Sequence, residues 1–593
     1  MISVLKLVNG SQKIYLLFLI FINIVSAILE TIGIGMLPIL LVSVLSPENF
    51  NLNKNYLDWL SIFNFSENKN YIVFLCIFLF IFFLLKNLFF IFVKWFESKV
   101  SQSINSNISS ILFKGYINLS YSMHQLQNPS IITRNIINEC QNLVTYITGI
   151  TNILREALII IFLFFLLYTQ NKLLSSFIFV FLIITLVFFY LFIRKSVFDR
   201  GQIAQNLTGQ QLKLISESFG AIKYIKILNL ESDFSERFYR NLRKILQQNI
   251  YLNLLQVIPK LFLELLAVGS LLLLSIYAAL FQKDNLYYFL PFLTLLGLIL
   301  VRTIPSFNVI SAALSSVRYH APSKDLLVKE ISFLKKNLSN RKFFLNKSKI
   351  NSNYLNKLFE IKEVSYFYPN TKKMVLNNIN LNIKPNTSVA VIGESGAGKS
   401  TLIDIILGLL EPSKGKILVD GKSLTKVVRE WQSILGFIPQ DIYLDDDTIK
   451  KNITFTHMEE KIDYQHLDKV LEITLLKNFI NSLPDKLETQ IGNRGIRLSG
   501  GQIQRIGIAR CLYQKPKIII MDEATSSLDY ESERQIIKAI NNIKYNTTFI
   551  TIAHRLSTIR KCDIIYFLRE GRIIDQGSYN QLKKRHRKFF LNL

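Results

Sequence analysis

The chain has 593 residues, of which half are hydrophobic and 19% are charged, and its formal net charge is +27. This length exceeds what one compact core usually holds, so two or more domains are expected. The basic residues lie largely beside apolar segments with no base-reading motif, which argues against a direct nucleic-acid function. The four cysteines, Cys76, Cys140, Cys511 and Cys562, have neither metal-ligand spacing nor the pattern of a disulfide framework.

Nearly all the long apolar runs fall before residue 306. A membrane-spanning helix needs about 20 mostly apolar residues, and six segments meet this requirement. The first continues through roughly 30 residues without a small-residue cleavage pattern, so it is interpreted as a retained span rather than a signal peptide. The predicted spans are residues 14–45, 71–93, 143–168, 173–193, 252–281 and 286–305.

The connections after the second and fourth spans are long, and the latter carries ten Lys or Arg side chains between Arg194 and Lys244. Both connections show helical periodicity and few breakers, so we expect them to continue the membrane helices into the cytoplasm. Turns near residues 121–129 and 219–225 are placed where they could touch a C-terminal domain. Simple solvated loops are the alternative interpretation.

After the sixth span, helical periodicity continues past Pro305 to about Leu334. A Lys/Asn/Ser-rich stretch then gives way to strand-like alternation at Leu358. The predicted organisation is a transmembrane domain over residues 1–334, a linker over 335–357 and a second domain over 358–593.

The strongest chemical signal is the segment Gly393-Glu394-Ser395-Gly396-Ala397-Gly398-Lys399-Ser400, followed by Thr401. It follows the apolar run 388–392 and precedes a helix-like stretch, which is the context of a phosphate-binding P-loop. The glycines Gly393, Gly396 and Gly398 let backbone N–H groups curl around phosphates. Lys399 supplies a charge and Ser400 a hydroxyl for Mg²⁺, so ATP and Mg²⁺ are the expected cofactors.

A second acidic motif follows the apolar run 518–521, where Asp522 and Glu523 stand in sequence. This arrangement predicts that Asp522 holds Mg²⁺ and that Glu523 polarises the attacking water. Upstream lies Leu498-Ser499-Gly500-Gly501-Gln502. With this signature the sequence resembles the ABC transporter family, and the domain order of six spans and then one ATPase domain resembles its exporter-type half-transporters.

The resemblance implies further roles by position. Residues 499–502, at a helix N-terminus, would cap the γ-phosphate bound to the opposite subunit's P-loop. Gln440 would stand in the Q-loop as a catalytic residue and a candidate Mg²⁺ ligand, and Tyr368 would stack on adenine. Further positions implied in the ATP site are Ser527, Asp529 and the switch histidine His554. The chain departs from the family pattern at two positions. Asn493 stands where such exporters usually carry Glu, and Tyr579 stands where they often carry His.

Glu523 and His554 are both present, so two identical chains would form two competent sites. A homodimer is therefore favoured over a heterodimer. Because the ATPase domain must meet cytoplasmic ATP, the resemblance implies a multi-pass protein of the bacterial inner membrane with cytoplasmic termini and ATPase domain.

Several ionisable residues lie within or beside the apolar spans. Each costs at least about 2.5 to 3.5 kcal/mol to insert, so most are expected to have a purpose. Three cations in this set suit an anionic ligand, although Lys86 and Arg155 could instead pair with neighbours. The substrate candidates are Glu30, Lys86, Arg155 and Arg302. Glu156 and Glu264 are further ionisable residues within or beside the spans.

Residues 55–63 could form a short amphipathic helix on the outer face that holds lipid tails. Together with Glu30-Thr31 and Arg302-Thr303-Ile304-Pro305-Ser306, this segment resembles the bacterial flippase that moves lipid-linked oligosaccharides for protein glycosylation. The expected function is ATP-driven export of an amphiphile, most simply a lipid-linked oligosaccharide or glycolipid. The alternatives are a multidrug or peptide exporter and an ATP-gated channel or regulator.

Overall fold

The computed structural model describes residues 8–45, 68–170, 172–281, 286–339, 358–369, 371, 373–456, 458–492, 495–522, 531, 535, 547–552 and 556–591. The chain divides into two compact units. The first contains Met1–Leu119 and Gln127–Leu338, and the second contains Ser120–Leu126 and Ser339–Leu593. The outer segment 55–63 and Asn493 lie outside the described residues.

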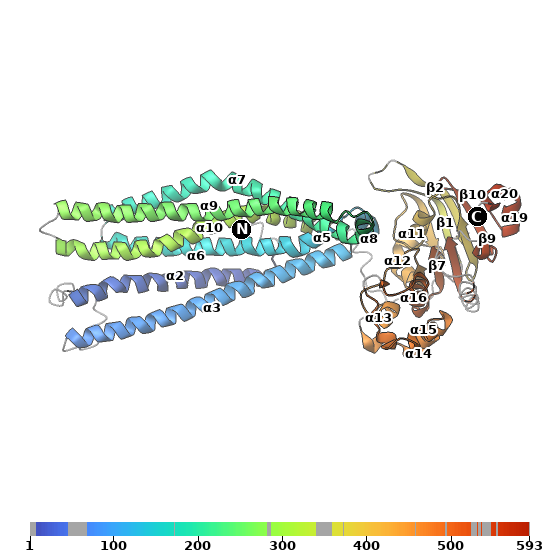
Figure 1. The fold of residues 1–593 in the computed structure, drawn as a ribbon, viewed down its shortest axis with the longest axis horizontal. Coiled ribbons are helices and arrows are strands. Elements are labelled where there is room, and N and C mark those ends of the chain that lie inside the picture. The colour runs from blue at the N-terminus through green and yellow to red at the C-terminus, as the bar shows by residue number, and fades with distance from the viewer. Residues whose placement is uncertain are drawn as a thin grey trace. The chain divides into compact units, whose positions relative to one another are not determined.

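The first unit is helical, and its long helices run side by side (Figure 1). Within the described residues, four stretches are long and apolar enough to cross a membrane: Gly10–Leu37, Ile72–Ile117, Pro129–Thr169 and Ile299–Leu338. The helices are α2 (Gly10–Leu45), α3 (Asn68–Ile117), α5 (Pro129–Arg134), a π-helical turn (Asn135–Glu139), α6 (Cys140–Gln170), α7 (Lys172–Gly220), α8 (Ile222–Ile227), α9 (Glu231–Phe281) and α10 (Leu286–Ser339); α4 (Tyr121–Gln125) follows α3 in sequence.

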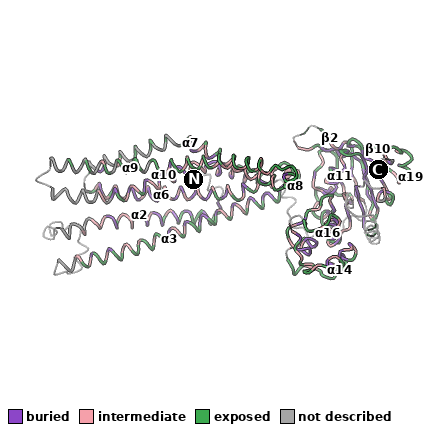
Figure 2. The backbone as a smooth tube through the Cα atoms, viewed as in Figure 1, coloured by how far each residue is buried: buried purple, intermediate pink, exposed green. Residues whose placement is uncertain are grey.

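Apolar side chains occupy both the inside and the outside of this helical unit. Inside, α2, α6 and α10 pack through a buried cluster that includes Ala27, Leu163 and Leu300. Outside, large apolar side chains such as Phe80 and Phe188 remain 70% exposed. Residues coloured as exposed recur along these helices (Figure 2). Apolar faces of this extent are stable against hydrocarbon but not against water.

The helices continue beyond their most apolar parts without a break, as the periodicity of the long connections predicts. In this region polar contacts replace apolar ones. Arg200 of α7 lies over the ring of Tyr251 of α9, 3.6 Å from its centroid, and donates to Gln248 at 3.1 Å. Gly201 faces the backbone carbonyl of Tyr319, where any side chain would collide, so α7 and α10 approach closely here.

The second unit contains two sheets within the described residues. The first is antiparallel with strand order β2-β1-β4-β5, and the second has the order β10-β9-β3-β8-β7-β6. Strands β9, β3, β8, β7 and β6 are parallel, while β10 is antiparallel to β9. The strands are β1 (Phe359–Phe367), β2 (Met374–Ile383), β3 (Ser388–Ile392), β4 (Lys414–Val419), β5 (Lys422–Ser423), β6 (Leu435–Ile438), β7 (Ile518–Asp522), β8 (Thr548–Ile552), β9 (Ile564–Arg569) and β10 (Arg572–Gly577).

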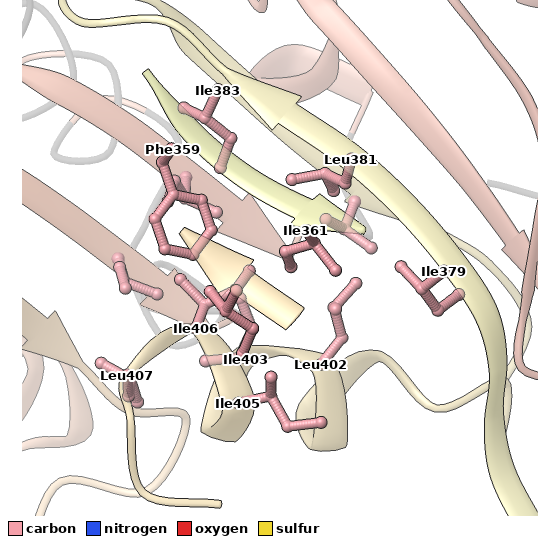
Figure 3. Close-up of a cluster of buried hydrophobic side chains, with 14 of the residues drawn as sticks. Phe359, Ile361, Ile379, Leu381, Ile383, Leu402, Ile403, Ile405, Ile406 and Leu407 are labelled. Carbon is pink, nitrogen blue, oxygen red and sulfur yellow. The ribbon is translucent and has the colours of Figure 1, made fainter. Parts of the chain in front are cut away.

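Helices flank these sheets and bury their apolar sides against them. The helix after the P-loop, α11, points Leu402, Ile403 and Ile406 into the core beneath β1 and β2 (Figure 3). Phe359 stacks on Trp431 at 4.7 Å between ring centroids. The helices are α11 (Lys399–Ile406), α12 (Leu424–Ser433), α13 (Ile449–Thr454), α14 (Tyr464–Ile473), α15 (Lys477–Asn481), α16 (Gly500–Tyr513), α18 (Leu556–Ile559), α19 (Tyr579–Arg585) and α20 (Arg587–Leu591).

One detail differs from the expectation. Residues 335–339, predicted as the start of the linker, form the last turn of α10. The polar composition there marks a solvated helix rather than a break, because Lys and Asn are tolerated on exposed helix faces. The remaining linker residues up to 357 lie outside the described part of the chain.

Candidate ATP site and intramembrane charge cluster

The P-loop connects β3 to α11 in the strand-loop-helix arrangement that its sequence predicts. All five residues of β3 are buried, which anchors the start of the loop in the parallel sheet. Gly396 and Gly398 adopt φ angles of +79° and +99°, the left-handed region that glycine enters without strain. At Gly393 a side chain would collide with the backbone carbonyl of Leu568.

These residues fit the phosphate chain of ATP. The buried ammonium of Lys399 donates to the carbonyl oxygens of Gly393 and Glu394, both at 2.9 Å, so it sits inside the curve of the loop. Ser400 is exposed at the first turn of α11. Positively polarised N–H groups at a helix N-terminus and a lysine within the same loop form an anion site.

Tyr368 lies beside this loop although 25 residues separate it from Gly393. Its hydroxyl is 3.0 Å from the hydroxyl of Thr401 on α11, and its ring meets that of Tyr366 edge-on at 5.2 Å. The ring is half-buried, which leaves a surface on which a planar group can stack. This geometry is compatible with the adenine contact that the resemblance implies for Tyr368.

Asp522 ends β7, two strands away from β3 in the same sheet. The carboxyl ends of parallel strands meet at one edge of a sheet, so Asp522 lies on the P-loop edge. Burial and, to a smaller extent, the negative charge of Asp522 together raise the pKa of Asp404, on α11, to about 6. The sequence had a signal for Asp404, an acidic residue inside the apolar run of α11, but our sequence analysis did not use it.

No group of three or more His, Cys, Asp or Glu side chains among the described residues converges as a metal site. Ser400, Asp522 and Gln440 are the candidates to hold Mg²⁺, which binds through few protein groups and mainly through nucleotide phosphates. Gln440 follows β6 and is exposed. Because β6 lies next to β7, Gln440 is at the same edge of the sheet as Asp522.

The signature segment begins α16. Ser499 is the N-cap, and it forms a capping box with Gln502: the Ser499 N–H donates to Gln502 at 2.8 Å and the Gln502 N–H donates to Ser499 at 3.3 Å. The side chain of Gln502 therefore supports the helix start, a structural role that the sequence analysis did not consider. Gly500 and Gly501 form the first turn, leaving its N–H groups accessible.

Several predicted catalytic and nucleotide-binding residues lie outside the described residues, and their roles stay predictions. They are Glu523, Ser527, Asp529 and His554.

A second group of functional candidates converges inside the first unit, contributed by four helices. Glu30 of α2 contacts Lys86 of α3 at 3.2 Å and Arg302 of α10 at 2.8 Å. Arg155 of α6 contacts the neighbouring Glu156 at 2.9 Å. Arg302 also lies 3.6 Å from Glu156, so all five side chains form one network. We call these five residues the intramembrane charge cluster.

The pairing changes the interpretation of these charges. The sequence left pairing with neighbours open for Lys86 and Arg155, and the structure shows these two cations and also Arg302 beside a carboxylate. Three cations and two carboxylates leave a net charge of +1. Ser306 joins the network by donating to Glu156 at 2.7 Å and accepting from Arg302 at 2.9 Å. Glu264 of α9 is exposed, and no contact to the cluster is seen within the described residues.

Comparison with known proteins identifies the family. The family model described as ABC transporter transmembrane region matches residues 14–304, and the family model described as ABC transporter matches residues 376–526. The chain belongs to the ABC transporter family, with both regions in one polypeptide. It is thus a membrane transporter driven by ATP, and the predicted fold class of a helical membrane domain joined to an α/β ATPase domain is confirmed.

Individual relatives are described with different functions. A protein of Wigglesworthia glossinidia brevipalpis described as an ATP-dependent lipid A-core flippase is 29% identical over 83% of this chain and 82% of its own. A multidrug resistance ABC transporter ATP-binding and permease protein of Lactococcus lactis is 37% identical over 39% of each chain. A solved bacterial Atm1-family ABC exporter with ATP bound has the same fold, with a TM-score of 0.78 over 99% of both chains and 21% identity.

Proposed function

We propose that two copies of this chain form an exporter of the bacterial inner membrane that flips an amphiphile with an anionic, sugar-bearing head group. A lipid-linked oligosaccharide or a glycolipid is the simplest cargo of this class. The similarity to a lipid A-core flippase over most of the chain supports this assignment. The ATPase domain and both termini would then face the cytoplasm.

The observation that carries the proposal is the position of Arg302 in the intramembrane charge cluster. Both carboxylates that Arg302 contacts have a second cation: Glu30 keeps Lys86, and Glu156 keeps Arg155. Arg302 is therefore the surplus charge. Its side chain is also the most exposed of the five, at 25%. Arg302 can move from the two carboxylates to a phosphate while each carboxylate keeps another cation as its partner.

A head-group site of this kind removes a large barrier. Moving an ion from water into hydrocarbon costs tens of kcal/mol by Born solvation, and each unpaired polar group costs several kcal/mol more. A guanidinium binds phosphate through two parallel charge-assisted hydrogen bonds. A route lined by Arg302 replaces part of the water that the head group loses.

The ATPase domain would drive this movement. Lys399 and the N–H groups of the P-loop would bind the phosphates, and Tyr368 would position the base. Ser400, Gln440 and Asp522 would hold Mg²⁺, which supplies charge compensation at the phosphates. Glu523 would polarise water for hydrolysis, with His554 beside it. ATP binding would close two ATPase domains, and hydrolysis would reset them.

The test is ATPase activity of the purified protein in lipid nanodiscs. Polyprenyl-pyrophosphate oligosaccharide, a lipid A-type glycolipid and a lipophilic cation are added separately to wild type and to Arg302→Ala. Arg240→Ala is a matched control, because Arg240 also pairs with a carboxylate, Glu236, but on an exposed helix face. Stimulation by an anionic lipid that is lost in Arg302→Ala and kept in Arg240→Ala supports the proposal.

The alternative has a distinct result. If the lipophilic cation stimulates ATPase activity equally in wild type and Arg302→Ala while anionic lipids have no effect, the protein is a multidrug exporter. Glu523→Gln provides the hydrolysis control: it should bind ATP without turnover. Normal turnover in that variant would contradict the role of Glu523.

A further inference from the structure

The second unit contains a cleft of about 760 Å³ beside the start of the P-loop. Gly393, Glu394 and Ser395 form one part of its lining, and β9 contributes Phe567 and Arg569. The end of α19, the start of α20 and His586 between them contribute the rest, residues 585–589. Small-molecule sites typically measure 300 to 1,000 Å³, so the cleft is large enough for a nucleotide-sized ligand.

The lining is strongly basic. It includes Arg569, Arg585, Arg587 and Lys588 against a single carboxylate, that of Glu394, with His586 among them. Cations gathered around a concave surface with low-dielectric walls attract anions by focusing the field. The cleft therefore selects for a negatively charged ligand.

Part of this lining is held in place. Asp575 of β10 accepts a hydrogen bond from Arg585 at 3.0 Å and lies 2.8 Å from the His586 ring nitrogen. Partial burial by itself would raise the pKa of Asp575. Hydrogen bonds from His586 and from the Gln576 N–H, together with the positive charges of Arg585 and His586, hold this pKa below its usual value. Among the described residues, Arg569, Arg587 and Lys588 have no carboxylate partner. Their charge remains available to a ligand.

An aromatic wall stands beside the cations. The ring of Phe567 is buried, with its centroid 4.5 Å from that of Phe589 and 4.9 Å from that of His586. Arginine and lysine beside aromatic rings are a combination that binds phosphates and can also accept a stacked base.

We propose that this cleft is an anion site of its own, which takes an oligophosphate: inorganic pyrophosphate or the phosphate chain of a second nucleotide. It is separate from the P-loop pocket because Lys399, Ser400 and Thr401 are not part of its lining. It shares Gly393, Glu394 and Ser395 with the P-loop, so a ligand bound in the cleft would alter ATP binding at the P-loop. The assignment is independent of the cargo and of the roles given to Arg302.

The test measures binding rather than turnover. Full-length protein in nanodiscs carries Lys399→Ala to disable the P-loop, and binding of labelled pyrophosphate is measured by equilibrium dialysis without ATP. Arg587→Gln with Lys588→Gln removes two cleft charges. Lys583→Gln with Lys584→Gln is the matched control, since it removes the same charge from α19 outside the cleft lining.

We expect Lys399→Ala to retain pyrophosphate binding and the cleft variant in that background to weaken it by about tenfold, a change of about 1.4 kcal/mol. The control should stay within about twofold of its parent. Loss of all binding in Lys399→Ala alone, or equal weakening by the control, would overturn the proposal. In a parallel arm with ADP, tighter binding than pyrophosphate identifies a nucleotide as the ligand, and equal binding identifies the oligophosphate alone.

Discussion

The guanidinium of Arg302 lies 2.8 Å from the carboxylate of Glu30, which joins α10 to α2 across 272 positions of sequence. Glu30 also holds Lys86 of α3, so one carboxylate links three helices. Removing one partner of such a network leaves the others without compensation, whereas surface ion pairs contribute little. The location of Glu30 within a span therefore makes it a structural centre as well as a candidate site residue.

The first prediction concerns this link. Glu30→Gln removes the carboxylate shared by Lys86 and Arg302, so we expect it to lower the free energy of unfolding by about 2 to 4 kcal/mol. The double variant Glu30→Gln with Arg302→Gln should be less destabilised than the sum of the two single variants, because it removes both charges together. Thermal unfolding of the nanodisc-embedded protein measures both effects.

Glu231→Gln is the control for that cycle. Glu231 pairs with Lys226 at 2.9 Å, but its side chain is 44% exposed. Its replacement should leave the midpoint of thermal unfolding nearly unchanged, because exposed ion pairs contribute little to stability. Strict additivity of Glu30→Gln and Arg302→Gln would show that the two groups do not act as one network.

The second prediction concerns backbone geometry in the P-loop. Gly398 has a φ of +99°, and an added Cβ would lie 2.9 Å from Leu376 and 3.0 Å from the Val375 carbonyl. Gly398→Ala should therefore weaken ATP binding by tenfold or more. The left-handed backbone costs a residue with a Cβ roughly 1 to 2 kcal/mol, and the clash adds to this cost. Binding of a fluorescent ATP analogue measures the change.

Gly421 offers a matched comparison. Its φ is +82°, and an added Cβ would meet no heavy atom of the described chain within 4 Å. Gly421→Ala carries the same kind of strain in a turn away from the loop, so it should lower stability slightly and leave ATP binding unchanged. An equal loss of binding in both variants would mean that strain, and not the shape of the P-loop, decides the result.

The third prediction separates two roles of Ser499. Ser499→Ala removes the N-cap of α16 and should cost about 1 kcal/mol of stability. Ser499→Asp keeps a good cap, so it should preserve the melting temperature. The added negative charge would repel the phosphate that this helix start is proposed to cap, so ATPase activity should fall at least tenfold. Full activity in Ser499→Asp would limit Ser499 to its structural role.

The fourth prediction concerns Cys511 on α16. Burial raises the pKa of its thiol to about 12. An unfolded thiol has a pKa near 8.5, so between these two pH values the folded protein keeps the proton that the unfolded chain releases. Its contribution to stability is complete below about pH 8.5 and is lost as the pH rises further. By pH 10 this loss should reach about 2 kcal/mol, and it should be absent from Cys511→Ala.

Maleimide labelling provides an independent check on Cys511. The thiolate is the reactive form, so Cys511 should stay unlabelled at pH 8 in the folded protein and react fully in denaturant. Mass spectrometry after proteolysis distinguishes it from the half-buried Cys562. Labelling of both thiols at equal rates in the native protein would contradict the burial of Cys511.

The sequence alone determined the features that depend on contiguous residues. A long apolar run must become a helix in hydrocarbon, where every backbone polar group needs an internal partner. A buried strand followed by Gly396, Gly398 and Lys399 must form an anion-binding turn before a helix. These features depend on residues that are neighbours in the sequence, so the bounds of α2, the start of α3 and the bounds of β3 were predicted within a few residues, and a helix was predicted where α11 follows the P-loop.

The tertiary structure alone decided which distant groups meet. Glu30, Lys86, Glu156 and Arg302 were recognised as costly charges, but their pairing depends on how four helices rotate and pack. The basic cleft likewise brings Ser395 next to Arg587 although 192 positions separate them. Single-sequence patterns report local periodicity, whereas the energy of these contacts arises only when helices and strands close long loops and exclude solvent around the paired charges.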